Sequence, residues 1–277
     1  MKVDLHIHSK YSDGELTPAK IVDTCVSAGL DIIALTDHDN VNGIFEARQQ
    51  AKSHGKLKVI SGIELSAFDN GQETHILAYG IDFESNLLRE KMLKIQKMRE
   101  DRNVKMVQKF KELGILIDYD TLKERHAGEV IGRGHIAKEL IAQGVCSSVQ
   151  EAFAKYLSPN GLAYVVSRRL TVAEAVGFAG KHGGVAVLAH PSKIKKNTAQ
   201  TERFVRELVQ LGLRGIEACY FSHTNVERDF YLYLAERYNL DVFGGSDFHS
   251  DTYGVKLGTY FEPPQKTREL LIELADK

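Results

Sequence analysis

Short apolar runs alternate with amphipathic segments along most of this chain, a pattern that predicts an α/β fold. The apolar runs predict strands at residues 3–8, 31–36, 58–63, 73–80, 184–189, 215–218 and 241–245, and a short strand near 256–261. The amphipathic segments predict helices at residues 17–29, 41–54, 171–182, 202–211, 226–238 and 266–275. Since strands and helices follow one another in turn, we expect a parallel sheet or a barrel.

The alternation stops between residues 86 and 166, where the pattern is helical only. A long helix rich in Lys, Arg and Glu is predicted at residues 87–113, followed by shorter helices at 119–125, 135–143 and 149–155. We therefore expect a barrel built from residues 1–85 and 167–277, with a helical insertion at 86–166. The insertion either forms a cap over the functional site or only braces the barrel.

Composition narrows the range of partners. The formal net charge of the 277 residues is -1, from 36 basic and 37 acidic side chains, which gives no general attraction to long duplex nucleic acid or to a membrane. No run of about 18 apolar residues predicts a membrane span, and no secretory leader is expected before the first strand. The cysteines are scattered and odd in number (Cys25, Cys146 and Cys219), which argues against a disulfide framework and favours a reducing cytoplasm.

Histidines and carboxylates gather where the predicted strands end. His6 and His8 are alternate residues of the first strand, so they should share one face while Leu5 and Ile7 share the other. Most of the others follow the carboxyl ends of later strands, where barrel enzymes build their sites. The full set is His6, His8, Asp13, His38, Glu64, His75, His190, Asp247 and His249. His75 lies near the start of its strand and fits the set only if that strand is antiparallel or part of a loop.

This set of side chains predicts a metal centre. Nine ligands are too many for one ion, which takes about four to six, but they suit two or three ions that share a bridging carboxylate. Mixed imidazole and carboxylate ligands are typical of Mn, Fe(II) or Zn. Three divalent ions would bring +6 and the carboxylates of Asp13, Glu64 and Asp247 would return -3, so the centre should bind an anion. Such a centre also lowers the pKa of a bridging water, which favours hydrolysis of a phosphate ester.

Five ordered motifs resemble those of the PHP (polymerase and histidinol phosphatase) family. They are His6-x-His8 with Ser12-Asp13-Gly14, then Thr36-Asp37-His38-Asp39, Gly62-Ile63-Glu64, Ala189-His190-Pro191 and Gly245-Ser246-Asp247-Phe248-His249. The resemblance implies a distorted (β/α)7 barrel with three metal ions, often Mn or Fe and sometimes Zn. Within the family the chain looks most like stand-alone enzymes with a helical insertion, some of which are nucleoside 3′,5′-bisphosphate phosphatases or 5′-to-3′ exoribonucleases on short RNA. Asp13 stands where other branches use His, which favours this branch.

The resemblance also assigns roles to individual residues. His6, His8, Glu64 and Asp247 would hold the first ion, Glu64 would bridge to a second ion with His75 and His190, and Asp13, His38 and His249 would hold the third. Glu64, Asp247 and His190 are the expected catalytic residues, and Mn²⁺ is the first expectation for the metal. The leaving oxygen would take its proton from a water, from His190 or from His249. Asp37 and Asp39 are expected to orient a ligand or to cap a helix rather than to bind metal.

Basic residues of the insertion are candidates for substrate binding. Arg133 and His135 precede a helix and resemble an Arg-Pro-His sequence of the family, with Gly134 in place of the Pro. An Arg at a helix start makes a fork-shaped clamp for phosphate. Lys155 and the pair Arg168-Arg169 are further candidates, and the alternative for all of them is an ordinary surface charge. The other histidines, His54, His126, His182 and His223, are expected to be ordinary surface or capped residues, although His223 could approach the site.

The sequence therefore predicts a cytoplasmic, metal-dependent phosphoric ester hydrolase that acts on a small phosphorylated substrate, a nucleotide or short oligonucleotide. Two alternatives stay open. One is an amidohydrolase-like metal hydrolase that cleaves C–N bonds, although no Lys stands at a strand end as the usual carbamylated ligand would. The other is a non-catalytic PHP module, although all nine ligand positions are filled.

Overall fold

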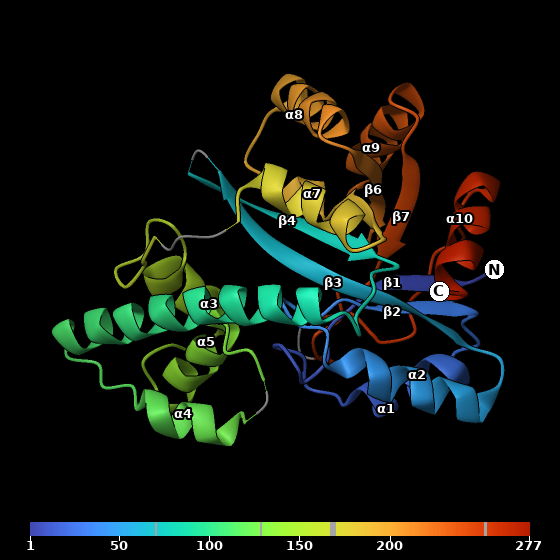
Figure 1. Cartoon of the computed structure of the whole chain (residues 1–277). Helices are drawn as coiled ribbons and strands as arrows, with labels where there is room; N and C mark the ends of the chain where they lie inside the picture. Colours follow the sequence, from blue (N-terminus) through green and yellow to red (C-terminus); the bar gives the residue numbers. More distant parts are fainter. Residues whose placement is uncertain (70, 128, 167–169, 252–253) are drawn as a thin grey trace. The chain divides into compact units, whose positions relative to one another are not determined.

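A computed structural model describes residues 1–69, 71–127, 129–166, 170–251 and 254–277 (Figure 1). The chain divides into two compact units. The first unit, here called the barrel unit, consists of Met1–Arg89 and Leu170–Lys277. The second, here called the helical unit, consists of Glu90–Arg169, so the division falls within helix α3 (Asn86–Glu112).

Seven strands form the sheet of the barrel unit in the order in which they occur along the chain: β1 (Val3–Ile7), β2 (Ile32–Leu35), β3 (Lys58–Asp69), β4 (Gln72–Tyr79), β5 (Val185–Leu188), β6 (Leu213–Tyr220) and β7 (Asp241–Gly245). A single parallel bridge between Ile7 and Phe248 joins the two ends of the sheet, which makes a nearly closed barrel. The predicted class, a distorted (β/α)7 barrel with a helical insertion, is confirmed.

One strand runs against the others. β1, β2 and β3 are parallel, as are β5, β6 and β7, but β4 is antiparallel to both of its neighbours. The start of β4 therefore lies at the edge of the barrel where the parallel strands end. This direction meets the condition under which His75 can join the other candidate ligands.

The longer helices described for the barrel unit lie outside its sheet: α1 (Pro18–Ser27), α2 (Gly43–His54), α7 (Val172–Lys181), α8 (Thr198–Gln210), α9 (Asn225–Arg237) and α10 (Gln265–Ala275) (Figure 1). The predicted start of α1 is confirmed, since the Thr17 side chain accepts the Lys20 N–H and Pro18 is the first helical residue. Helix α8 begins four residues earlier than predicted. Asn197 forms a capping box with Gln200 and fixes this earlier start.

Apolar clusters on both sides of the sheet stabilise the barrel unit, and two of them are clear among the described residues. The inner cluster joins residues from most strands, such as Leu5 and Phe243, and includes Leu271 and Leu274 of α10. The outer cluster packs α1 and α2 against the other side of β1 and β2. The chain thus buries both faces of its parallel strands, as their continuous apolar sequences predict.

Two predictions about strands are wrong. No strand forms near 256–261: among the described residues from 254 onward, Phe261 makes only an isolated bridge to Val3, and Gly258 adopts a φ of 94° that an extended strand does not allow. In addition, Leu5 and Ile7 do not share a face, because Leu5 lies in the inner cluster and Ile7 in the outer one. The pairing of β1 with β2 shifts its register between Asp4 and Ile7, and this irregularity turns the end of the strand.

The helical unit contains most of α3 together with α4 (Tyr119–Arg125), α5 (Arg133–Ala142) and α6 (Val149–Ala152), which continues into a π-helical turn at Phe153–Leu157. Its own core includes Phe110, Leu140 and Leu157. In the described part of the chain, no helix is both long and apolar enough to cross a membrane.

Candidate metal centre

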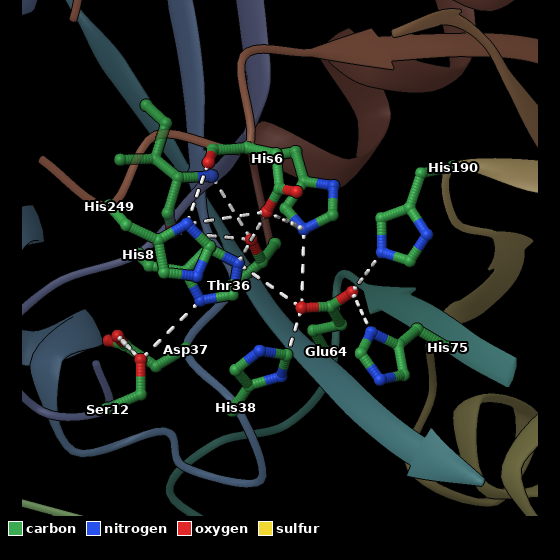
Figure 2. A network of polar contacts seen from close by, with 12 residues as sticks. His6, His8, Ser12, Thr36, Asp37, His38, Glu64, His75, His190 and His249 are labelled. Carbon is green, nitrogen blue, oxygen red and sulfur yellow. Dashed lines mark hydrogen bonds and ion pairs between the residues drawn. The ribbon is translucent and has the colours of Figure 1, made fainter. Parts of the chain in front are cut away.

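All nine predicted ligand side chains meet in one network at the end of the barrel. Glu64, on β3, lies at its centre and is buried (Figure 2). Glu64 Oε1 lies 2.8 Å from His75 Nδ1 and 2.9 Å from His190 Nε2. Glu64 Oε2 lies 3.0 Å from His38 Nδ1, 3.2 Å from His8 Nε2 and 3.4 Å from His6 Nε2. One carboxylate thus faces five imidazoles.

Two further carboxylates complete the network. Asp247 Oδ1 lies 3.2 Å from His8 Nε2 and 3.3 Å from His6 Nε2. Asp13 lies on the other side of His8, where its Oδ1 is 3.3 Å from His249 Nε2. The rings of His8 and His249 stack with their centroids 4.0 Å apart. The set therefore forms three overlapping groups of potential ligands: His6, His8, Glu64 and Asp247; His38, Glu64 and His75; and His8, Asp13, His38 and His249.

The donor atoms of these groups fit divalent cations. The buried atoms His6 Nε2, His8 Nε2, His38 Nδ1 and Asp13 Oδ1 lie close to the oppositely charged groups named above, but in the described part of the chain none of them makes a hydrogen bond of normal geometry. Buried polar atoms normally have such a partner, and several of these face one another at the centre of the network. Imidazole nitrogens and carboxylate oxygens within 4.8 Å of one another are what Mn, Fe or Zn would need as ligands.

The charges of the network favour a cation as well. Burial alone would raise the pKa of Glu64, but the charges of the surrounding histidines, His38 first, hold it well below its ordinary value. Burial likewise opposes the ionisation of Asp13 and Asp247, but the charge of His249 holds the pKa of Asp13 well below its ordinary value, and the charge of Lys193, followed by that of His6, does the same for Asp247, so all three carboxylates are ionised. Burial lowers the pKa of His190 to about 4, which keeps this imidazole neutral and able to bind a cation.

Asp37 and Asp39 support the loop that carries His38. Asp37 accepts hydrogen bonds from the Ser9 backbone at 2.7 Å and from the Ser12 hydroxyl at 2.6 Å, and burial raises its pKa to about 6. Asp39 Oδ1 accepts the Ser66 N–H at 3.2 Å. Neither residue caps α2, which follows Asn42.

Three residues at the site have no counterpart among the predicted ones. The Glu217 carboxylate on β6 contacts His6 and the backbone of His190. Lys193 donates to Asp247 Oδ2 at 2.8 Å, and the Tyr220 hydroxyl donates to the same oxygen at 3.1 Å. A single Glu within an apolar strand or a Lys in a loop has no distinctive spacing, so the sequence carried no signal for them beyond their place near strand ends.

The predicted substrate residues Arg133, His135 and Lys155 lie in the helical unit, whereas Arg169 is outside the described residues. Arg133 is the first residue of α5, and its guanidinium lies 5.6 Å from the Phe153 ring centroid. Both ring nitrogens of His135 are used within the unit: Nδ1 accepts the Gly132 N–H at 3.0 Å, and Nε2 faces Glu129 at 3.2 Å. The Lys155 ammonium lies over the Tyr156 ring.

The four other histidines lie outside the network of nine. His54 contacts Asp23, His126 contacts Glu129, His182 packs on Phe178, and the ring of His223 lies between those of Tyr220 and Tyr231. His223 Nδ1 bonds to the Ala218 carbonyl at 3.0 Å.

Comparisons with known proteins point to one family. A family model described as PHP domain matches residues 4–160. A 3′,5′-nucleoside bisphosphate phosphatase of Chromobacterium violaceum is 32% identical over 253 residues, which cover 91% of this chain and 88% of the relative. A 5′-3′ exoribonuclease of Haemophilus influenzae is also 32% identical, over 258 residues that cover 93% of each chain.

A solved structure gives the same result for the fold. An amidohydrolase from Chromobacterium violaceum, determined with bound sulfate and no metal, matches 99% of this chain and 97% of its own chain with a TM-score of 0.89 and 30% identity. The family model spans more than half of the chain, and the relatives span nearly all of it. The resemblance read from the five motifs is confirmed, and this chain belongs to the PHP domain family.

Proposed function

We propose that this chain hydrolyses the phosphate ester of a nucleotide, either a nucleoside 3′,5′-bisphosphate or the 5′ end of a short RNA, at a centre of three divalent ions. The observation that carries the proposal is the network of nine imidazoles and carboxylates around Glu64. The broader prediction, a metal-dependent phosphoric ester hydrolase, is confirmed by the activities of its relatives. Mn²⁺ is the metal that we propose first, with Fe²⁺ or Zn²⁺ as alternatives.

The nine side chains would hold three ions between them. His6, His8, Glu64 and Asp247 would hold the first, and Glu64 would link it to the second, to which His75 and His190 also belong. Asp13, His38 and His249 would hold the third. Bound there, divalent ions supply an activated water for attack on phosphorus and positive charge for the phosphoryl oxygens.

The chain itself adds a positive charge beside this centre. The Lys193 side chain is half-exposed and remains paired with Asp247. Its partial enclosure favours the neutral amine, but the charge of Asp247 outweighs this and raises the pKa of Lys193 above its ordinary value. A permanently charged ammonium at the edge of the centre favours an anionic substrate such as a phosphate ester.

Residues of the helical unit would bind the rest of the substrate. Arg133 stands at the N-terminus of α5, a position suited to a phosphate group because the helix dipole adds to the guanidinium charge. His135 would act by fixing the loop before α5, since its Nδ1 accepts the Gly132 N–H. Lys155 and Arg169 are proposed as further contacts to a nucleotide.

Hydrolysis of a C–N bond is the second candidate, because one of the solved structures that match this chain is described as an amidohydrolase. Lys193 argues against it. A carbamylated ligand forms from a neutral amine, whereas Lys193 is held as an ammonium by Asp247 and lies in the turn after β5 rather than on a strand.

A panel of substrates tests the proposal. Metal-free protein is reloaded with Mn²⁺, Fe²⁺ or Zn²⁺ and offered a nucleoside 3′,5′-bisphosphate, 5′-phosphorylated RNA of two to ten nucleotides, nucleoside monophosphates and a set of amides. We expect release of phosphate or of 5′-mononucleotides from the first two classes, and its loss in His6→Ala but not in His54→Ala. Turnover of amides alone would refute the proposal, and no turnover with any metal would favour a non-catalytic module.

A further inference from the structure

Glu217 is a buried carboxylate that contacts two of the proposed metal ligands. It lies on β6, its side chain is 1% exposed, and no motif of the sequence marks it. Its Oε1 lies 3.0 Å from His6 Nδ1, and its Oε2 accepts the backbone N–H of His190 at 2.6 Å. We propose that Glu217 is a positioning residue that fixes His6 through its ring and His190 through its backbone, so that the first two ion positions depend on it together. This inference rests on the proposed function only in taking His6 and His190 as metal ligands.

The contact with His6 determines which ring nitrogen is available. Both Glu217 oxygens act as acceptors, so when His6 binds a cation as a neutral ring, its hydrogen lies on Nδ1. The lone pair is then on Nε2, which faces Asp247 Oδ1 at 3.3 Å and Glu64 Oε2 at 3.4 Å. His6 Nε2 is also one of the buried atoms without a hydrogen-bond partner among the described residues. Glu217 therefore turns the free nitrogen toward the centre and prevents the ring from flipping.

The contact with His190 supports an unusual backbone conformation. His190 has φ 24° and ψ 63°, in the left-handed region that residues with a side chain rarely adopt. This turn ends β5 and directs the imidazole toward Glu64, 2.9 Å from His190 Nε2. The short hydrogen bond from the His190 N–H to Glu217 holds the turn in place. Without it, the backbone could relax and carry the imidazole away from Glu64.

Packing alone does not explain a carboxylate at this position. Its neighbours on β6, Ile216 and Ala218, are fully buried apolar residues, and a residue of that kind would fill the space without the cost of burying a charge. Among the described residues, the hydrogen bonds of the Glu217 side chain go to His6 on β1 and to His190 in the turn after β5. A carboxylate that accepts two hydrogen bonds at once is what these two ligands require.

Metal binding by Glu217→Gln tests the inference. The amide has the size of the carboxylate, but an NH₂ donor replaces one of its two oxygens. His6 and His190 bond different oxygens of Glu217, so one of the two N–H groups would face this NH₂ instead of an acceptor. We expect the affinity for Mn²⁺, measured by competition with a fluorescent chelator, to fall by about 10–100-fold. The metal content per chain should drop to what Asp13, His38 and His249 hold. When Co²⁺ is bound in place of Mn²⁺, the visible spectrum of the variant should differ from that of the wild type. If Glu217 only stabilised the fold, the two spectra would be the same.

Asp241→Asn is the matched control. Asp241 is a buried carboxylate at the start of β7, the opposite end of the barrel, where it pairs with Arg214 and Lys266. This variant should lower the thermal stability and leave Mn²⁺ affinity unchanged. Equal losses of affinity in the two variants, or unchanged affinity in Glu217→Gln, would overturn the inference.

A second variant covers the case in which Glu217→Gln does not fold. Glu217→Asp keeps the charge but is one methylene shorter, so it can reach one of the two partners and should lose less affinity than the amide; unchanged affinity would again overturn the inference. Because these experiments measure metal binding and not activity, they test the role of Glu217 independently of the proposed function. A protein that binds metal and loses it on mutation of Glu217, but releases no phosphate from nucleotides, would refute the function and leave the role of Glu217 intact.

Discussion

Replacement of Glu64 by Gln is the sharpest perturbation of the metal centre. The amide has nearly the same shape as the carboxylate, so it removes the charge and changes little of the packing. Glu64 belongs to two of the three ligand groups, and its two oxygens face five imidazoles. In the wild type these imidazoles all face one negatively charged acceptor group. In Glu64→Gln the charge is gone, and an NH₂ donor would face some of them.

The expected loss of metal affinity follows from the two ligand groups to which Glu64 belongs. Loss of a residue that merely orients a metal ligand costs about 10–100-fold in metal affinity. Glu64 is proposed as a ligand itself and takes part in two groups, so that factor applies at least once to each. The combined loss is roughly 10²–10⁴-fold, or about 3–6 kcal/mol. Since catalysis needs both ions, turnover should fall by at least as much.

Two measurements on the same samples check this estimate. Metal per chain is determined by mass spectrometry after dialysis against Mn²⁺, and phosphate release is followed with a nucleoside 3′,5′-bisphosphate. Glu236→Gln, the same chemical change at an exposed position of α9, is the control and should match the wild type. Metal content and turnover of Glu64→Gln within threefold of the wild type would refute the central place given to this carboxylate.

Three further changes address other parts of the chain. Lys193→Met should raise KM for the nucleotide roughly 10-fold, since a charge-assisted hydrogen bond is worth about 1.5–3 kcal/mol and solvent screens part of it. Lys195→Met is the control, and an equal rise of KM in both variants would contradict the role of Lys193. Arg133→Lys should raise KM without changing metal content, because lysine cannot form the two-pronged contact with phosphate, and an unchanged KM would count against Arg133. Glu129→Gln should lower Tm by about 2–4 °C at pH 7 if its hydrogen bonds to two histidines contribute about 1 kcal/mol. Burial alone would raise the pKa of Glu129, but the hydrogen bonds from His135 and His126 lower it. This stabilisation is therefore fully present above the ordinary glutamate pKa and is lost as the pH falls below it, through the lowered pKa of the folded protein. A Tm difference from wild type that does not shrink as the pH is lowered through this range, or an equal difference in Glu124→Gln, would contradict the assignment.

The sequence determined the elements and most of the polar set. Periodicity and capping residues are local, so α4 and β7 were predicted with their observed bounds, and Thr17-Pro18 marked the start of α1. The five motifs place their histidines and acids directly after apolar strands, and parallel strands bring their carboxyl ends to one edge. The convergence of those side chains was therefore predictable.

Contacts that only the tertiary structure reveals decided the direction of β4, the role of Glu217 and the absence of the strand expected near 256–261. Local pattern did not give the direction of β4, and that direction brings His75 to Glu64. Nor did it reveal Glu217, which reaches His6 across 211 positions of the sequence because β6 and β1 take part in the same barrel. The strand expected near 256–261 failed for a similar reason: among the described residues of this stretch, only Phe261 pairs with another strand, through one bridge to Val3 of β1. Local preferences set which residues form a helix or strand, whereas contacts between distant segments depend on register and closure, which no single stretch of sequence contains.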